Sequence, residues 1–157
     1  MKRTRLTNLA LLPFFLCVVV LVLLGKAFNL TYKQISVVVN LWLQGAILTL
    51  SGVAPAAAAM YKLCTGGSVF WLVATVLLLA YAAAYIYGFI RMLRHYRLPF
   101  NDAFQLCVDD LEKLAKRWHT TYEMVNLVIF VLLFLVLSGT NFGLAYYITQ
   151  QKKGHNI

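Results

Sequence analysis

Four stretches of this chain consist almost entirely of apolar residues and alternate with short polar segments. They cover residues 9–24, 35–53, 69–90 and 124–147. About 20 apolar residues in an α-helix are needed to cross the roughly 30 Å of hydrocarbon in a bilayer. The pattern therefore predicts an all-α, polytopic membrane protein with four transmembrane helices, in a single membrane domain over residues 1–157.

A further helix is predicted in the polar segment between the third and fourth stretches, residues 91–123. At about 100° per residue, the apolar residues of about 100–118 fall on one side of a helix and the charged residues on the other. We expect this amphipathic helix either to lie at the lipid interface or to dock its apolar face on a partner protein or on the chain's own helices. That docking face consists of Phe100, Phe104, Cys107, Val108, Leu111, Leu114, Ala115 and Trp118.

The second apolar stretch contains a stripe of polar side chains. At the spacing of a regular α-helix, Ser36, Asn40, Gln44 and Ser51 share one face. A polar group in hydrocarbon is costly without a partner. We expect the stripe to form hydrogen bonds between helices, and alternatively to line a permeation or ligand path. In a third interpretation, the stretch is re-entrant, which leaves three transmembrane helices.

Small residues four apart mark the third stretch, at Ala80, Ala84 and Gly88. Such a seam lets helix backbones approach closely, so it is predicted to be a packing surface. Arg91, Arg94 and Arg97 continue the same helix. Their side chains are expected to reach the phosphates of anionic lipid head groups.

A weak internal similarity links the segments LTYKQISVVV (30–39) and TTYEMVNLVI (120–129). Both offer a helix cap, for which we assign Thr31 with Gln34 and Thr120 with Glu123. If the segments are repeats, one span separates them, so their helices run parallel. The alternative is that two unrelated spans begin with the same cap and an interfacial tyrosine.

Charge is distributed unevenly along the chain. It has 14 Lys and Arg but five Asp and Glu, and all five acids lie between residues 102 and 123. Basic residues at helix ends normally determine topology and contact lipid, and no nucleic-acid-binding motif accompanies them. With four spans, six basic residues face one side and eight the other, so the positive-inside rule leaves the orientation undecided.

The basic N-terminus and the basic segment 91–123 can both lie inside only if one of the first three stretches does not cross the membrane. The polar stripe makes the second stretch the candidate. An outward N-terminus or dual topology also remains open.

No catalytic constellation is evident. Cys17, Cys64 and Cys107 are dispersed, and the histidines are far apart in sequence, so neither a metal site nor a cofactor is predicted. We therefore expect a non-enzymatic protein of the plasma membrane or bacterial inner membrane. It would act as a subunit or regulatory partner of a membrane assembly, bound to another protein or to a second copy. The alternative is an oligomeric transporter or channel component with a path lined by the second span.

Overall fold

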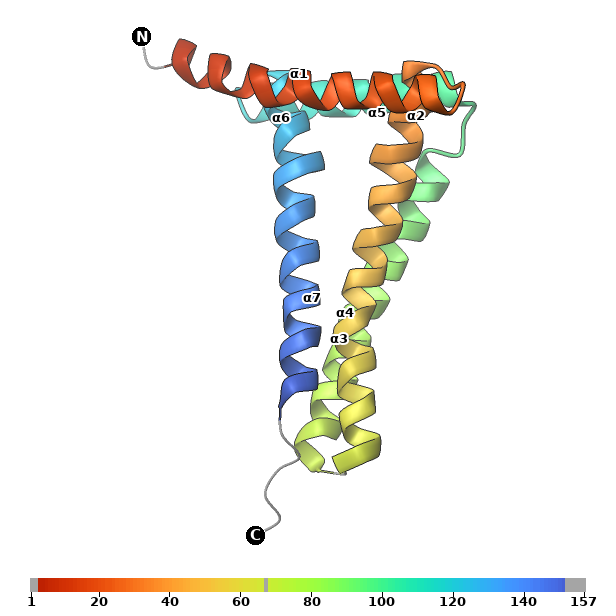
Figure 1. The fold of residues 1–157 in the computed structure, drawn as a ribbon, viewed down its shortest axis with the longest axis vertical. Coiled ribbons are helices and arrows are strands. Elements are labelled where there is room, and N and C mark those ends of the chain that lie inside the picture. The colour runs from red at the N-terminus through yellow and green to blue at the C-terminus, as the bar shows by residue number, and fades with distance from the viewer. Residues whose placement is uncertain (1–2, 67, 152–157) are drawn as a thin grey trace. The chain divides into compact units, whose positions relative to one another are not determined.

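The computed structural model describes residues 3–66 and 68–151, and every regular element in this part of the chain is a helix (Figure 1). Two of the elements are π-helices, labelled η. Each continues directly into the α-helices on either side of it, so that α2, η1 and α3 form one helix and α6, η2 and α7 another. The elements are α1 (Arg3–Ala27), α2 (Tyr32–Ser36), η1 (Val37–Leu43), α3 (Gln44–Gly66), α4 (Val69–His95), α5 (Phe100–Arg117), α6 (Tyr122–Leu127), η2 (Val128–Leu133) and α7 (Phe134–Gln150).

Three helices are long and apolar enough to cross a membrane: Tyr32–Gly66, Val69–His95 and Tyr122–Gln150. An all-helical membrane protein is therefore confirmed, with three candidate spans. The predicted span at 9–24 lies on α1, whose described apolar part, Leu12–Ala27, is shorter than a span requires. The suspected re-entrant stretch at 35–53 is instead part of an unbroken helix of 35 residues.

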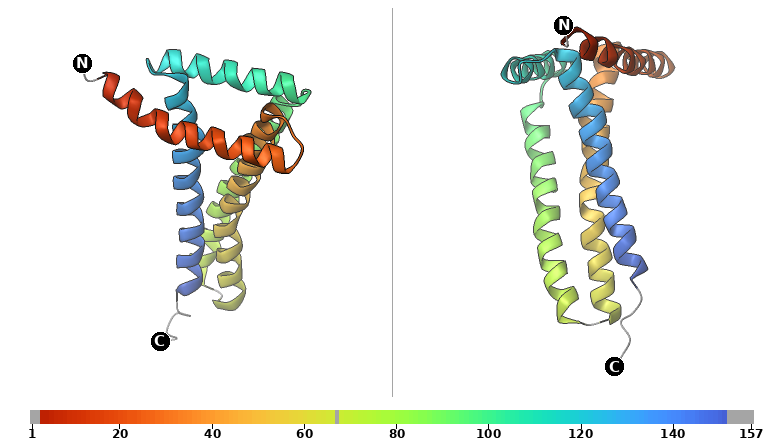
Figure 2. Two further views of the ribbon diagram at one scale, coloured as in Figure 1. Left: turned by 45° about the horizontal axis from the view of Figure 1, so that its top comes forward. Right: turned by 90° about the vertical axis from the view of Figure 1, so that its left-hand side faces the viewer.

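The helices divide into two compact units, which are described separately. The first comprises residues 1–44 and 93–134, and the second comprises residues 45–92 and 135–157. In the first unit, α1 contacts both α2 and α6, and α5 also contacts both of them. Both α2 and α6 leave this pair of helices in the same direction (Figures 1 and 2).

The turn between α1 and α2 is a Schellman motif, in which backbone N–H groups beyond the helix cap its last carbonyl groups. The N–H of Leu30 donates to the carbonyl oxygen of Gly25 at 2.8 Å, and that of Asn29 to Lys26 at 3.4 Å. Asn29 adopts a left-handed conformation, with φ of 55°. Asparagine tolerates this conformation better than most residues, so the sequence suits a sharp turn here.

The same turn recurs 90 residues later, between α5 and α6. Thr120 donates to the carbonyl oxygen of Ala115 at 3.0 Å, and His119 to Lys116 at 3.3 Å. His119 is also left-handed, with φ of 52°. Within the described residues these two positions are the only non-glycine residues with positive φ. The repeat is therefore one of structure as well as of sequence.

The helices that follow the two turns begin with equivalent threonine caps. The Thr31 side chain accepts from the Gln34 N–H and forms the expected capping box. In the second repeat Thr121 accepts from the Met124 N–H. The cap assigned to Thr120 was wrong by one residue, because that residue belongs to the preceding turn.

The sequence repeat extends well before the segment noticed at first. From residue 14 to residue 32, nine positions carry the same amino acid 90 residues later. These pairs are Phe14/Phe104, Leu16/Leu106, Cys17/Cys107, Val18/Val108, Leu21/Leu111, Leu24/Leu114, Lys26/Lys116, Thr31/Thr121 and Tyr32/Tyr122. Thus α1, predicted as a span, is the counterpart of α5, predicted as an interfacial helix.

The two repeats exchange aromatic contacts. Phe14 of the first packs edge-on against Tyr122 of the second, with ring centroids 6.3 Å apart. Phe104 of the second packs in the same manner against Tyr32 of the first, at 6.0 Å. Edge-to-face geometry at this distance is the favourable arrangement for aromatic pairs. Each repeat is therefore held by contacts with the other.

In the second unit, α3 and α4 approach closely at two glycines. A methyl group placed on Gly52 would lie 2.5 Å from the Tyr85 ring, and one on Gly45 would lie 2.9 Å from the Phe89 ring. The nearest atom of Tyr85 is Cγ, the ring atom bonded to its Cβ, so the ring cannot easily move away from an added methyl group. These glycines therefore permit the close helix contact in the second unit.

Gly52→Ala should lower the thermal stability of the purified protein in detergent, because overpacking of this kind costs about 1–3 kcal/mol. The matched control is Gly139→Ala, since a methyl group there would meet nothing within 4 Å. The control should melt at the native temperature or slightly above it. Equal melting temperatures for the two variants would show that α3 and α4 are not in close contact at Gly52.

Candidate functional site

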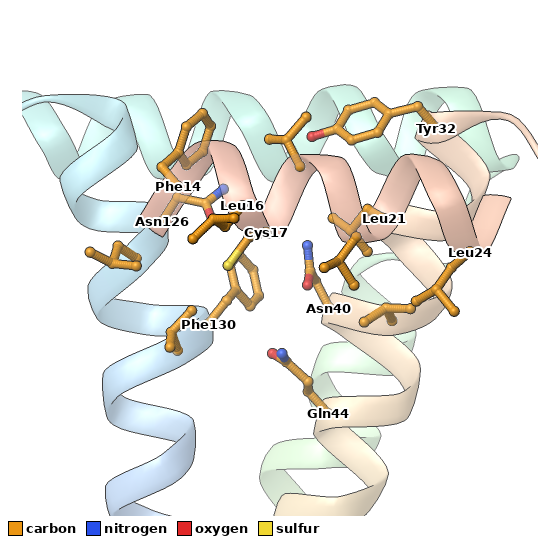
Figure 3. A pocket seen from close by; sticks show the side chains of 15 residues that line it. Phe14, Leu16, Cys17, Leu21, Leu24, Tyr32, Asn40, Gln44, Asn126 and Phe130 are labelled. Carbon is orange, nitrogen blue, oxygen red and sulfur yellow. The ribbon is translucent and has the colours of Figure 1, made fainter. Parts of the chain in front are cut away.

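A cavity of about 270 Å³ lies beneath α1 in the first unit, between η1 and η2. Its polar lining includes the three amide side chains of Asn40, Gln44 and Asn126. Figure 3 shows Asn40 and Gln44 reaching from one helix into the space below α1, with Phe130 on the facing helix. The remaining lining residues are Phe14, Leu16, Cys17, Val18, Val20, Leu21, Leu24, Tyr32, Val39, Leu127 and Val131.

The three amides differ in their hydrogen bonding. The Asn40 amide donates to the Ser36 hydroxyl at 3.2 Å, and the Asn126 amide donates to the Tyr122 hydroxyl at 3.3 Å. Both bonds join residues four apart on one helix, so they orient the amides without linking helices. The side-chain amide of Gln44 has no hydrogen-bond partner among the described residues, and its polar atoms are not buried. It is therefore available to a polar group in the cavity.

The predicted stripe is divided between the two units. Ser36, Asn40 and Gln44 belong to the first unit, whereas Ser51 belongs to the second. The π-helix at 37–43 lies between Ser36 and Gln44. A π-helix has more residues per turn than the 3.6 assumed in the prediction, so a projection at 100° per residue loses register across it.

Ser51 takes part in a polar network of the second unit. It is fully buried, and its hydroxyl accepts a hydrogen bond from the Asn141 amide at 3.2 Å. The Asn141 carbonyl accepts from the Tyr81 hydroxyl at 2.9 Å, and that hydroxyl lies 2.9 Å from the hydroxyl of Tyr85. This part of the stripe therefore joins helices, as hydrogen bonds between spans commonly do. Asn141 lay outside the prediction, although it stands 90 residues after Ser51.

The small-residue seam of α4 is exposed within the described part of the chain. Ala80, Ala84 and Gly88 are all exposed, and a methyl group on Gly88 would meet nothing within 4 Å. The buried residues of α4 are Thr75 and Ala82. Contact of the seam with another protein stays a prediction.

Arg91 and Arg94 lie one turn apart near the end of α4, whereas Arg97, predicted to continue the helix, lies in the segment after it, because α4 ends at His95. All three are exposed. Their binding of anionic lipid stays a prediction.

The predicted docking face of α5 is largely occupied by the chain's own helices. Leu111 and Ala115 are buried with Val125 of α6 in one cluster, and Cys107 and Leu114 pack at its edge. Near the ends of the helix, Phe104 contacts Tyr32, Phe100 lies with its ring centroid 5.4 Å from that of Trp42, and Trp118 remains exposed. Val108 lines a second cavity, with a volume of about 10 Å³. We expected lipid, a partner protein or the chain's own helices against this face, and within the described residues the chain's own helices cover most of it.

Asp110 on α5 connects this helix to the end of α4. Its carboxylate accepts hydrogen bonds from the ring of His95 at 3.1 Å, the hydroxyl of Tyr96 at 3.2 Å and the amine of Lys113 at 3.3 Å. The sequence offered no pairing of a histidine with a carboxylate, because His95 and Asp110 meet only through the fold. The bond from His95 first, and those from Lys113 and Tyr96, lower the pKa of Asp110 below its ordinary value of 3.8.

Nearby groups have the opposite shift. Burial raises the pKa of the Cys107 thiol to about 11, and Asp110 adds to the effect. A thiol with such a pKa stays protonated at neutral pH and is a poor nucleophile. Burial also raises the pKa of Tyr96, which therefore acts as a hydrogen-bond donor. This cluster fastens two helices, and it contains no group prepared for nucleophilic attack.

These features define an integral membrane protein with three candidate spans, two further helices joined to them by equivalent turns, and an amide-lined cavity. Comparison of the chain with known protein families, with curated proteins and with solved structures finds no match. Within residues 3–66 and 68–151, no three His, Cys, Asp or Glu side chains come together as a metal site.

Asp110→Asn should loosen the attachment of residues 93–98 to α5 at neutral pH. The lowered pKa means that the hydrogen bonds stabilise the charged carboxylate, so their contribution is present above its ordinary pKa and disappears as the pH falls through the lowered value. The Asp110 side chain is 34% exposed, so the effect should stay below about 1 kcal/mol.

Hydrogen exchange of residues 93–98, followed by mass spectrometry, measures this attachment. The native protein and Asp110→Asn should differ at pH 7 and converge only as the pH falls well below 3.8, where the native carboxylate becomes protonated. Asp109→Asn is the control, because Asp109 accepts its hydrogen bond from Gln105 on the same helix. An equal effect of the two substitutions at pH 7 would contradict the assignment.

Proposed function

We propose that this protein crosses the membrane three times and works without catalysis, as a subunit or regulatory partner of a larger membrane assembly. The observation that supports the proposal most is the distribution of charge around the three candidate spans. With three spans, residues 1–31 and 96–121 lie on one side of the membrane, and the turn at 67–68 and the tail after 150 lie on the other. The segments on the first side are then much longer than those on the second.

Basic residues follow the same inequality. Of the 14 Lys and Arg, all but Lys62, Lys152 and Lys153 lie on the first side or at the helix ends that adjoin it. The positive-inside rule then assigns this side to the cytoplasm of a plasma membrane or bacterial inner membrane. The four-span topology left that rule undecided, whereas the three-span topology satisfies it. In this orientation α1 and α5 both lie on the cytoplasmic side.

The outer side of α5 is the surface proposed for the partner. Its apolar side is occupied within the chain, while the opposite side exposes acids and bases together: Asp102, Asp109, Glu112, Lys113, Lys116 and Arg117. A surface for anionic lipid alone would be basic, and the acids here would weaken its attraction to lipid. Mixed charge instead suits a protein surface of complementary pattern, where it would fix the orientation of the partner.

A transporter or channel component is the second candidate function, and the amide-lined cavity supports it. Asn40 and Gln44 face an open space, as a path would require. Farther along the same helix, however, Ser51 is fully buried and hydrogen-bonded to Asn141. A path along this helix would have to open that contact, so the assembly role is preferred.

Cysteine labelling in intact cells tests the topology. In a background with Cys17, Cys64 and Cys107 changed to serine, Thr4→Cys and Asp109→Cys should both resist a membrane-impermeant thiol reagent until the cells are permeabilised. Ser68→Cys, in the turn between two spans, should react in intact cells. Labelling of Thr4→Cys and Asp109→Cys from opposite sides of the membrane would instead establish four spans.

Site-specific photo-crosslinking in the same cells tests the proposed partner surface. A photoreactive amino acid in place of Glu112 should give a protein adduct of one discrete mass, and the same residue in place of Val136, an exposed apolar position of α7, should not. Reversing the charges of Lys113, Lys116 and Arg117 should reduce the Glu112 adduct at least fivefold. Unchanged crosslinking in that variant would exclude this surface as the partner's site.

A further inference from the structure

The cavity beneath α1 has a counterpart in the second repeat that is nearly filled. The lining residues Phe14, Cys17, Val18, Leu21 and Tyr32 of the first cavity correspond, 90 residues later, to Phe104, Cys107, Val108, Leu111 and Tyr122 of the second. The first has a volume of about 270 Å³ and the second of about 10 Å³. The same architecture can therefore pack closed, and its open form in the first repeat requires an explanation.

One exchanged residue distinguishes the two cavities. Asn40, Asn126 and Phe130 line both of them, whereas Gln44 lines the open cavity alone. The residue 90 positions after Gln44 is Phe134, so an amide stands where the second repeat has a larger aromatic ring. The open cavity therefore presents three amide side chains, those of Asn40, Gln44 and Asn126.

The lining determines the charge of a suitable ligand. None of the residues around the open cavity is an acid, a base or a histidine. A charged head group would lose its hydration there without gaining a counter-ion, which disfavours it strongly. Hydroxyl and carbonyl groups, in contrast, can donate to and accept from the amides of Asn40, Gln44 and Asn126.

The outer surface of α1 indicates how a ligand would reach the cavity. On α5 the outward positions carry charges, whereas on α1 the equivalent positions are apolar: Val19 stands where the second repeat has Asp109, and Leu23 where it has Lys113. Val19 is 52% exposed and Leu23 is 60% exposed. This surface is suited to the apolar edge of the bilayer, which would bring the cavity beneath α1 within reach of lipid.

We propose that this cavity binds the uncharged head group of a membrane amphiphile, whose hydrocarbon chain remains in the bilayer. Its volume lies just below the usual range of about 300–1,000 Å³ for ligand pockets. Liquid water occupies about 30 Å³ per molecule, so the space corresponds to roughly nine waters. That accommodates a glyceryl or similar head group and the first carbons of a chain, but not a whole lipid.

Photo-crosslinking with a defined lipid tests the proposal on the full-length protein in phosphatidylcholine vesicles. The probe is a monoacylglycerol with a diazirine near the head group and an alkyne at the end of the chain. A fatty acid with the same two groups is the anionic comparison. The monoacylglycerol should label peptides of α1, η1 and η2, and unlabelled monopalmitoylglycerol should compete for this labelling while palmitate should not.

Two variants separate recognition of the head group from general access. Asn40→Leu combined with Gln44→Met removes two amides at nearly constant volume, and labelling should fall at least fivefold. Asn40→Phe introduces the residue of the second repeat, and should close the cavity with a similar loss. Thr49→Val is the control, because this hydroxyl donates to the Gly45 carbonyl away from the cavity; its labelling should match the native protein. Each variant is compared at an equal folded fraction, measured by thermal denaturation.

Three results would overturn the proposal. Native labelling in the Leu/Met variant would show that the amides do not recognise the head group. Equal labelling by the fatty acid would exclude selection for an uncharged group. Labelling that monopalmitoylglycerol cannot displace would exclude a defined site and would favour a water-filled cavity, as the transporter alternative requires.

Discussion

The first unit depends on one constraint: a helix that ends near the start of a membrane span must satisfy its last backbone carbonyl groups within a few residues. Both turns meet it with the same Schellman bonds, from Leu30 to Gly25 and from Thr120 to Ala115. A left-handed residue in each turn redirects the chain, and a threonine then caps the next helix. Because the turn is short, each helix stays against the start of the following span, and the cavity forms in the space so enclosed.

Much of the helical content could be predicted from apolar pattern alone. The three candidate spans and the helix at 100–117 were found because long apolar runs and a one-sided apolar face are signals within a single segment. The span predicted at 9–24 is not confirmed, because the described apolar part of α1 is short for a span. Composition alone does not distinguish a short span from a surface helix here, whereas the alignment of α1 with α5, 90 residues later, favours a shared role for the two helices.

The candidate site could be predicted only in part. Asn40 and Gln44 were recognised because amides in an apolar run are costly, whereas Asn126 resembled an ordinary residue of the first turn of a span. The π-helices at 37–43 and 128–133 have no signal in a pattern based on 3.6 residues per turn. They change which side chains share a face across residues 37–43, whereas Gln44 and Ser51, seven apart within α3, keep the spacing of a regular α-helix. The bond between His95 and Asp110 depends on tertiary structure, which periodicity does not describe.

The proposed three-span topology also gives α4 a role. In that topology each repeat is a surface helix followed by a span, and both repeats begin on the same side of the membrane. The first repeat then ends on the opposite side, so an additional span is needed to bring the chain back. Within the described residues, α4 buries only Thr75 and Ala82. Apart from the contacts of Tyr81, Tyr85 and Phe89, its sequence is therefore constrained mainly by length and hydrophobicity, which leaves the rest of its surface free to vary.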